Sequence, residues 1–168
     1  MTLVYLSIGS NKGDKVNNIH QATGLIANCE NIKLVRASTL YESEPWGEKN
    51  QPWFVNAALE VKTSLTPDEF LKKMQEIELR LGRVRDENTK KWGEREIDID
   101  IIFWGNEIIN EENLKAPHPY AHKRAFVLVP LLELIPDFIH PVIKKSLLDI
   151  HSELDDPEDV FLYGTRIE

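Results

Sequence analysis

The most informative stretch of this chain is Lys91-Trp92-Gly93-Glu94-Arg95-Glu96-Ile97-Asp98-Ile99-Asp100-Ile101-Ile102. Its second half alternates isoleucine with aspartate, which is typical of a strand with one apolar face and one carboxylate face. Aspartate is a poor strand former, and strand rise places Asp98 and Asp100 about 7 Å apart on one face. Because Mg²⁺ binds through one or two carboxylates together with substrate phosphates, the pair is a candidate metal site. The alternative is a solvated strand face.

A small basic patch lies directly before this strand. Between Arg80 and Arg95, six basic residues face three acidic ones, whereas the whole chain carries a net charge of −8. A patch of this size suits the phosphates of a nucleotide better than a long nucleic acid, which usually binds a basic domain. A charged loop that is merely solvated is the alternative. We therefore expect small-molecule substrates and no nucleic acid.

Length and composition indicate a single domain over residues 1–168, because 168 residues with 42% hydrophobic and 29% charged residues can bury one sizeable core. No apolar run approaches the roughly 20 residues that span a membrane, and the first residues lack a signal-peptide layout. The single cysteine, Cys29, fits a reducing compartment. We expect a cytoplasmic monomer with no membrane contact. From Asp149 onward there are seven acids and one base, which predicts a solvated acidic extension over residues 149–168.

Hydrophobic periodicity and turn residues divide the chain into alternating elements. Strands are expected at residues 3–8, 32–41, 54–63 and 97–103, helices at 14–27 and 66–81, and a loop at 42–52. The second helix has the clearest signals: Thr66 can act as N-cap, Pro67 stands at the first helical position and Glu69 completes a capping box. Gly82 is expected to end it.

The order strand-helix-strand-strand-helix-strand predicts an α+β fold with a ferredoxin-like βαββαβ core. We expect an antiparallel sheet with helices on one face, C-terminal additions, and the other face left for a ligand. Among the additions, an apolar helix over residues 124–135 should be broken at Pro130.

Two rival functions are less consistent with the sequence. A nucleotidyltransferase also combines a Gly-Ser turn with Asp-x-Asp, but there the pair follows within about a dozen residues, whereas here almost ninety separate Ser10 from Asp98. A ferredoxin-like ligand-sensing or RNA-binding module would have no use for two carboxylates beside an arginine. Motifs of P-loop and dinucleotide-binding proteins are missing from the sequence.

The chain resembles the 6-hydroxymethyl-7,8-dihydropterin pyrophosphokinase family of folate biosynthesis over nearly its whole length, through about Pro141. The most specific part of the resemblance is the stretch from Trp92 to Ile102. Further matches follow in the expected order: Gly9-Ser10-Asn11 with Gly13-Asp14, Gln51-Pro52 to Asn56-Ala57-Ala58, Glu78 with Gly82-Arg83-Val84-Arg85, and Pro117-His118-Pro119 with Arg124-Ala125-Phe126. The resemblance implies transfer of pyrophosphate from ATP to the pterin hydroxymethyl group, which yields AMP and the pterin diphosphate.

The resemblance also implies roles for individual residues. Asp98 and Asp100 would hold two Mg²⁺ ions, and Arg83 and Arg95 would join them as catalytic residues. The nucleotide would be bound by Gln75, Glu78, Arg85, Lys91, Trp92, Ile101, His118 and Arg124. The pterin would be bound by Ser43, Glu44, Pro45, Trp46, Phe54, Asn56 and Phe126. Two of these positions depart from the family pattern: Glu44 stands where proline is common, and Lys91, which cannot form a bidentate fork, stands where arginine is frequent.

Overall fold

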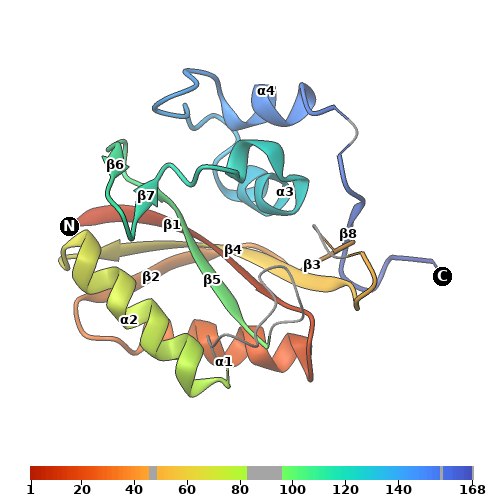
Figure 1. The fold of residues 1–168 in the computed structure, drawn as a ribbon, viewed down its shortest axis with the longest axis horizontal. Helices are drawn as coiled ribbons and strands as arrows, with labels where there is room; N and C mark the ends of the chain where they lie inside the picture. Colours follow the sequence, from red (N-terminus) through yellow and green to blue (C-terminus); the bar gives the residue numbers. More distant parts are fainter. Residues whose placement is uncertain (46–48, 83–95, 156, 168) are drawn as a thin grey trace.

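The computed structural model describes residues 1–45, 49–82, 96–155 and 157–167 (Figure 1). Its elements, in chain order, are β1 (Thr2–Ser10), α1 (Lys15–Ala27), β2 (Ile32–Ala37), β3 (Tyr41–Ser43), β4 (Phe54–Thr63), α2 (Pro67–Arg80), β5 (Asp98–Trp104), β6 (Ile109–Asn110), β7 (Lys115–Ala116), the 3₁₀ helix η1 (Ala121–Lys123), α3 (Ala125–Leu134), α4 (Leu147–Ser152) and β8 (Val160–Leu162). Within the described ranges, no helix is both long and apolar enough to cross a membrane.

The main sheet has six strands in the order β5-β1-β4-β3-β8, with β2 also paired to β4. All of these pairings are antiparallel, while β6 and β7 form a separate small sheet. The predicted ferredoxin-like order is confirmed, with β2 and β3 together filling the place of the second expected strand.

Helices α1 and α2 lie side by side on one face of the sheet (Figure 1). Their N-termini follow the expected chemistry: the Asp14 side chain accepts from the amide of Asn17, and Thr66 and Glu69 form a capping box. The core between these helices and the sheet contains Ile19, Ala22 and Ile26 of α1, Phe70, Met74 and Ile77 of α2, and Ile8, Ala57, Leu59, Ile99 and Ile101 of the strands. Burial of this apolar surface accounts for the helix layer on this face.

Helices α3 and α4 lie on the opposite side of the sheet (Figure 1). A second core joins Val127, Leu128 and Leu131 of α3 and Leu147 and Ile150 of α4 to Tyr5, Ala58, Ile102 and Phe103 of the sheet. The C-terminal additions therefore cover part of the face that was expected to be left for a ligand.

Helix α3 runs without interruption through Pro130, so the predicted break is wrong. A proline removes one amide donor and crowds the carbonyl of residue i−4, here Phe126. Both neighbouring core residues, Leu128 and Leu131, are almost fully buried. Their packing against the sheet holds the helix together, since tertiary burial overrides local propensity.

The segment between β2 and β3 interrupts the expected strand over residues 32–41. Here the chain still follows β4, because the Ser38 amide donates to the Ala58 carbonyl at 2.9 Å and the Ala58 amide donates to Ser38 Oγ at 2.8 Å. The chain then resumes as β3 at Tyr41, inside the region partly expected to be a loop.

The acidic extension is not merely a solvated appendage. Strand β8 pairs with β3, with Val160 opposite Ser43 and Leu162 opposite Tyr41. Glu158 is buried, with 8% of its surface exposed. The expectation of a wholly solvated extension is therefore wrong, because a charge count does not show which acids have partners.

Candidate functional site

Asp98 and Asp100 lie on the face of the sheet that carries α3. Their neighbours Ile99 and Ile101 belong to the core beneath α1 and α2, and successive side chains of a strand point to opposite faces. In the pairing of β5 with β1, Asp98 is opposite Gly9 and Asp100 is opposite Ser7. The alternation read from the sequence is confirmed, and it brings two carboxylates to one surface.

A row of residues crosses three strands at this point. Gly9 of β1 is paired with Asp98 on one side and with Asn56 of β4 on the other. Directly opposed residues in antiparallel strands share a face, so Asp98 and Asn56 are two strand spacings apart, about 10 Å. Gly9 places no side chain between them.

Asn56 is buried at 2% exposure and is held in a fixed orientation. Its Nδ2 donates to Ser43 Oγ on β3, and a Cβ atom built on Gly9 would lie 2.8 Å from its Oδ1. Phe54, two residues earlier on β4, is paired with Ser43 and also borders Gly9. Three of the predicted pterin residues, Ser43, Phe54 and Asn56, are therefore brought together beside Gly9.

Arg124 and Phe126 come to this face from the start of α3. Arg124 is buried at 6% exposure, and its guanidinium lies 5.2 Å from the ring centroid of Tyr120 and 5.7 Å from that of Phe126. Burial lowers the pKa of Arg124, while the negative charges of Asp100 and Asp98 oppose that change. The guanidinium and the two carboxylates therefore interact across the same region.

His118 lies near Arg124 and Asp98 as a neutral imidazole. Burial, together with the positive charge of Arg124, lowers the pKa of His118 to about 4, against the opposing effect of Asp98. Its Nδ1 accepts a hydrogen bond from the Tyr120 amide at 3.1 Å, so the ring proton resides on Nε2. His118 can therefore offer one N–H donor to an anion at neutral pH.

Three predicted nucleotide residues lie at the edge strand β5 or on α2. Glu78 is buried at 2% exposure, and its Oε2 accepts the Ile99 amide at 2.9 Å. Gln75 is exposed one turn earlier on α2. The side chain of Ile101 is packed in the helix-side core, so a nucleotide could meet this residue only through its main chain.

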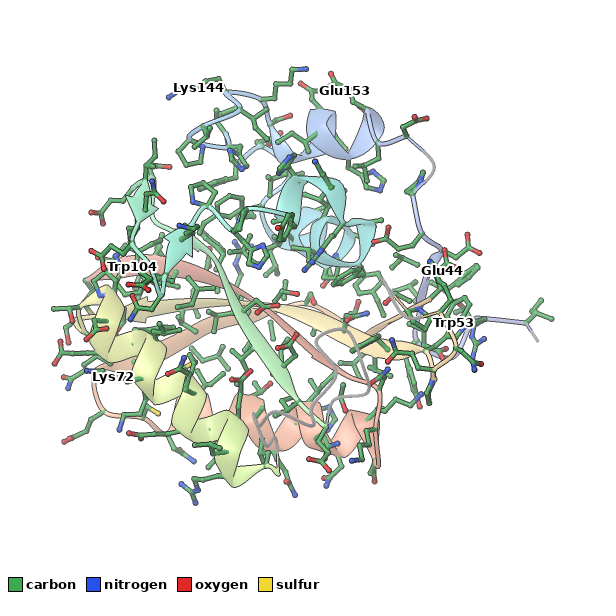
Figure 2. The ribbon with its side chains drawn as sticks, viewed as in Figure 1. Glu44, Trp53, Lys72, Trp104, Lys144 and Glu153 are labelled. Atoms are coloured by element: carbon green, nitrogen blue, oxygen red, sulfur yellow. The ribbon has the colours of Figure 1, made fainter. Side chains whose placement is uncertain are left out.

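Several predicted site residues lie outside the described residues: Trp46, Arg83, Arg85, Lys91, Trp92 and Arg95. Pro45 follows Glu44 in the segment after β3 and is buried. Glu44 lies at the end of the sheet where Trp53 and the C-terminal segment are also found (Figure 2). Its carboxylate accepts the amide of Asp159 at 2.9 Å.

The metal-binding capacity of the described residues rests on the two aspartates. Within this part of the chain, no group of three or more histidine, cysteine, aspartate or glutamate side chains could hold a metal ion. A pair of carboxylates without further protein ligands is the donor set that Mg²⁺ uses when substrate phosphates complete its coordination.

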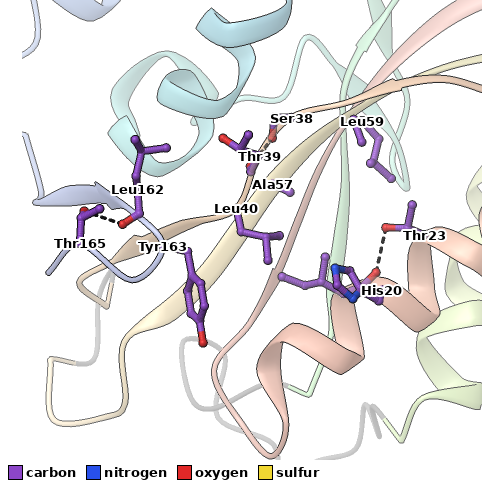
Figure 3. A pocket seen from close by; sticks show the side chains of 12 residues that line it. His20, Thr23, Ser38, Thr39, Leu40, Ala57, Leu59, Leu162, Tyr163 and Thr165 are labelled. Atoms are coloured by element: carbon purple, nitrogen blue, oxygen red, sulfur yellow. Dashed lines mark hydrogen bonds between the residues drawn. The ribbon is translucent and has the colours of Figure 1, made fainter.

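A hollow of about 620 Å³ lies elsewhere, between α1 and the C-terminal segment (Figure 3). Its described lining includes Ile19, Leu40, Leu59, Leu162 and Tyr163. The rest of the described lining adds His20 and several hydroxyl groups but no aspartate, glutamate, lysine or arginine. The hollow therefore lacks the carboxylate pair that makes Asp98 and Asp100 a candidate metal site.

Sequence reasoning gave no role to two residues that shape the site. Gly9 was recognised as part of a motif, but the need for a missing side chain beside Asn56 becomes visible only in the strand register. Glu158 accepts the amide of Phe126 at 3.0 Å from within the acidic extension. No local pattern distinguishes this glutamate from its acidic neighbours.

Comparison with known sequences gives one consistent family. Residues 5–136 match the sequence model of "7,8-dihydro-6-hydroxymethylpterin-pyrophosphokinase (HPPK)". The chain is 43% identical over 153 residues to the 2-amino-4-hydroxy-6-hydroxymethyldihydropteridine pyrophosphokinase of Aquifex aeolicus, covering 91% of this chain and 92% of that protein. It is 42% identical over 141 residues to the protein of that name from Haemophilus influenzae, covering 84% and 86%.

Solved structures with a similar fold include a crystal structure of Plasmodium falciparum HPPK-DHPS. It matches with a TM-score of 0.71 and 16% identity, covering 90% of this chain and 43% of that chain. This chain thus spans less than half of that longer protein, and the likeness concerns the fold alone.

Proposed function

The chain belongs to the 7,8-dihydro-6-hydroxymethylpterin-pyrophosphokinase family, and from this membership we propose how its residues divide the work of the reaction. The enzyme is an ATP-dependent diphosphokinase of folate biosynthesis. It transfers pyrophosphate from ATP to the hydroxymethyl group of 6-hydroxymethyl-7,8-dihydropterin, and it yields AMP and the pterin diphosphate. In bond terms, the hydroxymethyl oxygen attacks the β-phosphorus, the bond from that phosphorus to the α–β bridging oxygen breaks, and the hydroxyl proton is released.

We propose that Asp98 and Asp100 hold Mg²⁺, with two ions in the site. The observation that carries this assignment is the placement of both carboxylates on one face of β5, beside Arg124. The donor set fits, because two carboxylates leave coordination positions for phosphate oxygens. When bound, Mg²⁺ neutralises phosphate charge and favours attack at phosphorus.

The cationic and neutral donors around the aspartates orient the triphosphate. Arg124 remains protonated and supplies charge-assisted hydrogen bonds to phosphate oxygens. His118 donates from Nε2 without adding a charge. Gln75, Glu78 and the main chain of Ile101 border the nucleotide at the outer edge of β5, so that ATP spans this edge strand.

The family resemblance assigns the remaining phosphate and nucleotide contacts to residues 83–95. Arg83 and Arg95 act as catalytic cations, while Arg85, Lys91 and Trp92 contact the nucleotide. Phosphoryl transfer needs positioning and charge neutralisation more than covalent catalysis, and such a set of cations meets that need.

The pterin lies on the sheet between Asn56 and Asp98. Asn56, held by its hydrogen bond to Ser43, forms hydrogen bonds with the amide edge of the pterin ring. Phe54 and Phe126 stack on the two faces of that ring. The segment Glu44–Trp46 completes the pocket. With Gly9 between the two polar residues, the flat ring can rest on the strand while its hydroxymethyl group points toward Asp98 and the phosphates.

Product analysis tests the function. Purified protein is incubated with ATP, Mg²⁺ and 6-hydroxymethyl-7,8-dihydropterin, and ³¹P NMR follows the phosphates. The expected products are AMP and a pterin diphosphate, with no turnover after EDTA. Formation of ADP and a pterin monophosphate would contradict the proposal.

We also propose that the chain acts as one pyrophosphokinase domain, as a monomer in the cytoplasm, without binding nucleic acid. The composition and the small-molecule site support this reading. Light scattering during size-exclusion chromatography measures the mass in solution, which should match the 19.4 kDa of one chain.

A further inference from the structure

The C-terminal segment, residues 157–167, touches the site from behind β3. Strand β8 pairs with β3 and places Val160 opposite Ser43, the residue that holds Asn56. The two chains are also joined just beyond the ladder: the Glu44 amide donates to the Asp159 carbonyl at 3.2 Å, and the Asp159 amide donates to the Glu44 carboxylate at 2.9 Å. Strand β3 is therefore held between β4 on one side and the C-terminal segment on the other.

Aromatic and ionic contacts fasten the same segment. Phe161 stacks on Trp53, with ring centroids 6.2 Å apart and an interplanar angle of 25°. The guanidinium of Arg166 lies 4.0 Å from the Trp53 ring centroid and 3.7 Å from the Glu42 carboxylate. Trp53 directly precedes Phe54, so these contacts anchor the start of β4.

Glu158, the residue before Asp159, contacts the first turn of α3. Glu158 is buried, and its Oε1 accepts the amide of Phe126 at 3.0 Å. Amides in the first turn of a helix have no intrahelical partner, and a carboxylate is favourable at that end of the helix dipole. The N-cap residue of α3, Arg124, makes no side-chain cap bond of its own. Glu158 therefore caps the helix from a distant part of the sequence.

These contacts join the two walls that the pterin would lie between. One wall is the end of the sheet, with Ser43, Phe54 and Asn56; the other is the first turn of α3, with Phe126. A single peptide bond connects Glu158, which holds the helix, to Asp159, which holds β3.

We propose that Glu158 is a positioning residue of the pterin site: its carboxylate fixes the first turn of α3, so that Phe126 stands at the correct distance from Phe54 and Asn56. The inference rests on the proposed function, because it takes these three residues as the pterin contacts. Glu158 touches no substrate, and its effect reaches the ring through Phe126. The amide of Asp159 helps to position Glu158, because its hydrogen bond to the Glu44 carboxylate holds the C-terminal segment against the residue that follows β3.

The test compares two substitutions at each of two adjacent positions in the full-length chain. Glu158→Ala removes the acceptor for the Phe126 amide, whereas Glu158→Gln keeps an acceptor oxygen. Asp159→Pro removes the amide that bonds Glu44, whereas Asp159→Ala keeps that amide and deletes only an exposed side chain. Calorimetry measures pterin binding in the presence of a non-hydrolysable MgATP analogue, and separately measures binding of the analogue.

We expect Glu158→Ala to weaken pterin binding about tenfold, as loss of a helix cap at a binding wall would do. Asp159→Pro should weaken it in the same direction, while Glu158→Gln and Asp159→Ala stay within about twofold of the wild type. Affinity for the nucleotide analogue should change by less than about twofold in the two Asp159 variants. Both Glu158 variants lose a negative charge that acts on Arg124, so for this ligand they are compared with each other and should agree within about twofold. A merely structural role would lower the melting temperature without this separation of the two ligands.

The outcomes separate the inference from the function on which it rests. Equal pterin affinity in the wild type and Glu158→Ala would overturn the positioning role alone. The same holds if Glu158→Ala lowers the affinities for the pterin and for the nucleotide analogue by the same factor. If Glu158→Ala does not fold, the test rests on the other pair of variants. Pterin affinity in Asp159→Pro is then compared with that in Asp159→Ala, and equal affinities would overturn the positioning role. Pterin binding by the wild type without AMP formation would overturn the function alone, and no pterin binding by the wild type would overturn both.

Discussion

The carboxylate of Glu78 accepts a hydrogen bond from the backbone amide of Ile99, 2.9 Å away, between the two aspartates of the edge strand. Ile99 is opposite Ile8 in the ladder, yet its amide points outward to α2 instead of inward to β1. A buried side chain thus supplies the partner that a further strand would otherwise provide. Glu78 supports the strand whose other face carries Asp98 and Asp100.

Removal of this support should weaken both the fold and the reaction. Glu78→Ala should lower the free energy of unfolding by about 1.5–3 kcal/mol, because a buried amide loses a charged acceptor. Turnover should fall by about tenfold or more, because a small displacement of positioned catalytic groups is costly. Urea unfolding and AMP release measure the two effects. Glu76→Ala, on the exposed side of the same helix, is the control, and equal stability of the two variants would speak against the role of Glu78.

Loss of either aspartate should abolish most of the activity. Asp98→Ala or Asp100→Ala should reduce turnover by several orders of magnitude, because charge stabilisation by a metal in the transition state is worth several kcal/mol. The melting temperature should change little, since both carboxylates are only partly buried. AMP release at saturating ATP and Mg²⁺ provides the measurement, with the exposed Asp137→Ala as control. Near-normal turnover in both variants would rule out a metal site at this pair.

A side chain at Gly9 should damage pterin recognition. In Gly9→Ala the new Cβ would approach Asn56 Oδ1 to 2.8 Å, so the amide must move from the position set by Ser43. We expect the KM for the pterin to rise about tenfold and the free energy of unfolding to fall by about 1–3 kcal/mol. The control is Gly24→Ala in α1, where nothing lies within 4 Å of the added atom. There alanine should stabilise the helix by up to about 1 kcal/mol, and an equally mild result at Gly9 would refute the argument.

Acid should destabilise the protein through buried histidines. Burial lowers the pKa of His140 from 6.5 to about 4. Its Nδ1 accepts the amides of Val142 and Ile143, each at 3.1 Å. The unfolded state therefore takes up a proton first, so stability is complete above pH 6.5 and declines as the pH falls toward about 4.

His140→Asn keeps an acceptor near the position of Nδ1 but cannot take up this proton. The loss of unfolding free energy between pH 7 and pH 4.5 should therefore be smaller in this variant, by about 1–2 kcal/mol. His118 contributes the same trend in both proteins. Urea titrations at both pH values provide the measurement, and an identical loss of unfolding free energy in His140→Asn and in the wild type would contradict the prediction.

The features that the sequence predicted are those with a local signature. Alternation located Asp98 and Asp100, and the strand expected over residues 54–63 contained Asn56. The capping box around Thr66 fixed the start of α2. Each of these depends on residues a few positions apart, so the pattern is complete within one segment.

The features that it did not predict depend on distant partners. Strand β8 has only three residues, too few for a period to be recognised, and it is a strand because β3 offers an edge. Glu158 is one acid among several until the first turn of α3 is placed beside it. Pro130 stays helical because its neighbours Leu128 and Leu131 are buried against the sheet. Helix propensity depends only on local sequence and does not include this burial.

An open sheet ends in two edges, and exposed edges can recruit a strand from another molecule and so begin aggregation. In this chain, β8 covers the edge of β3 and is itself only three residues long. At the other end, α2 brings the charged Glu78 to the amide of Ile99, so an incoming strand would have to displace a carboxylate. The same contacts that border the proposed substrate surface thus also protect these two stretches of sheet edge, along β3 and at Ile99, against intermolecular strand addition.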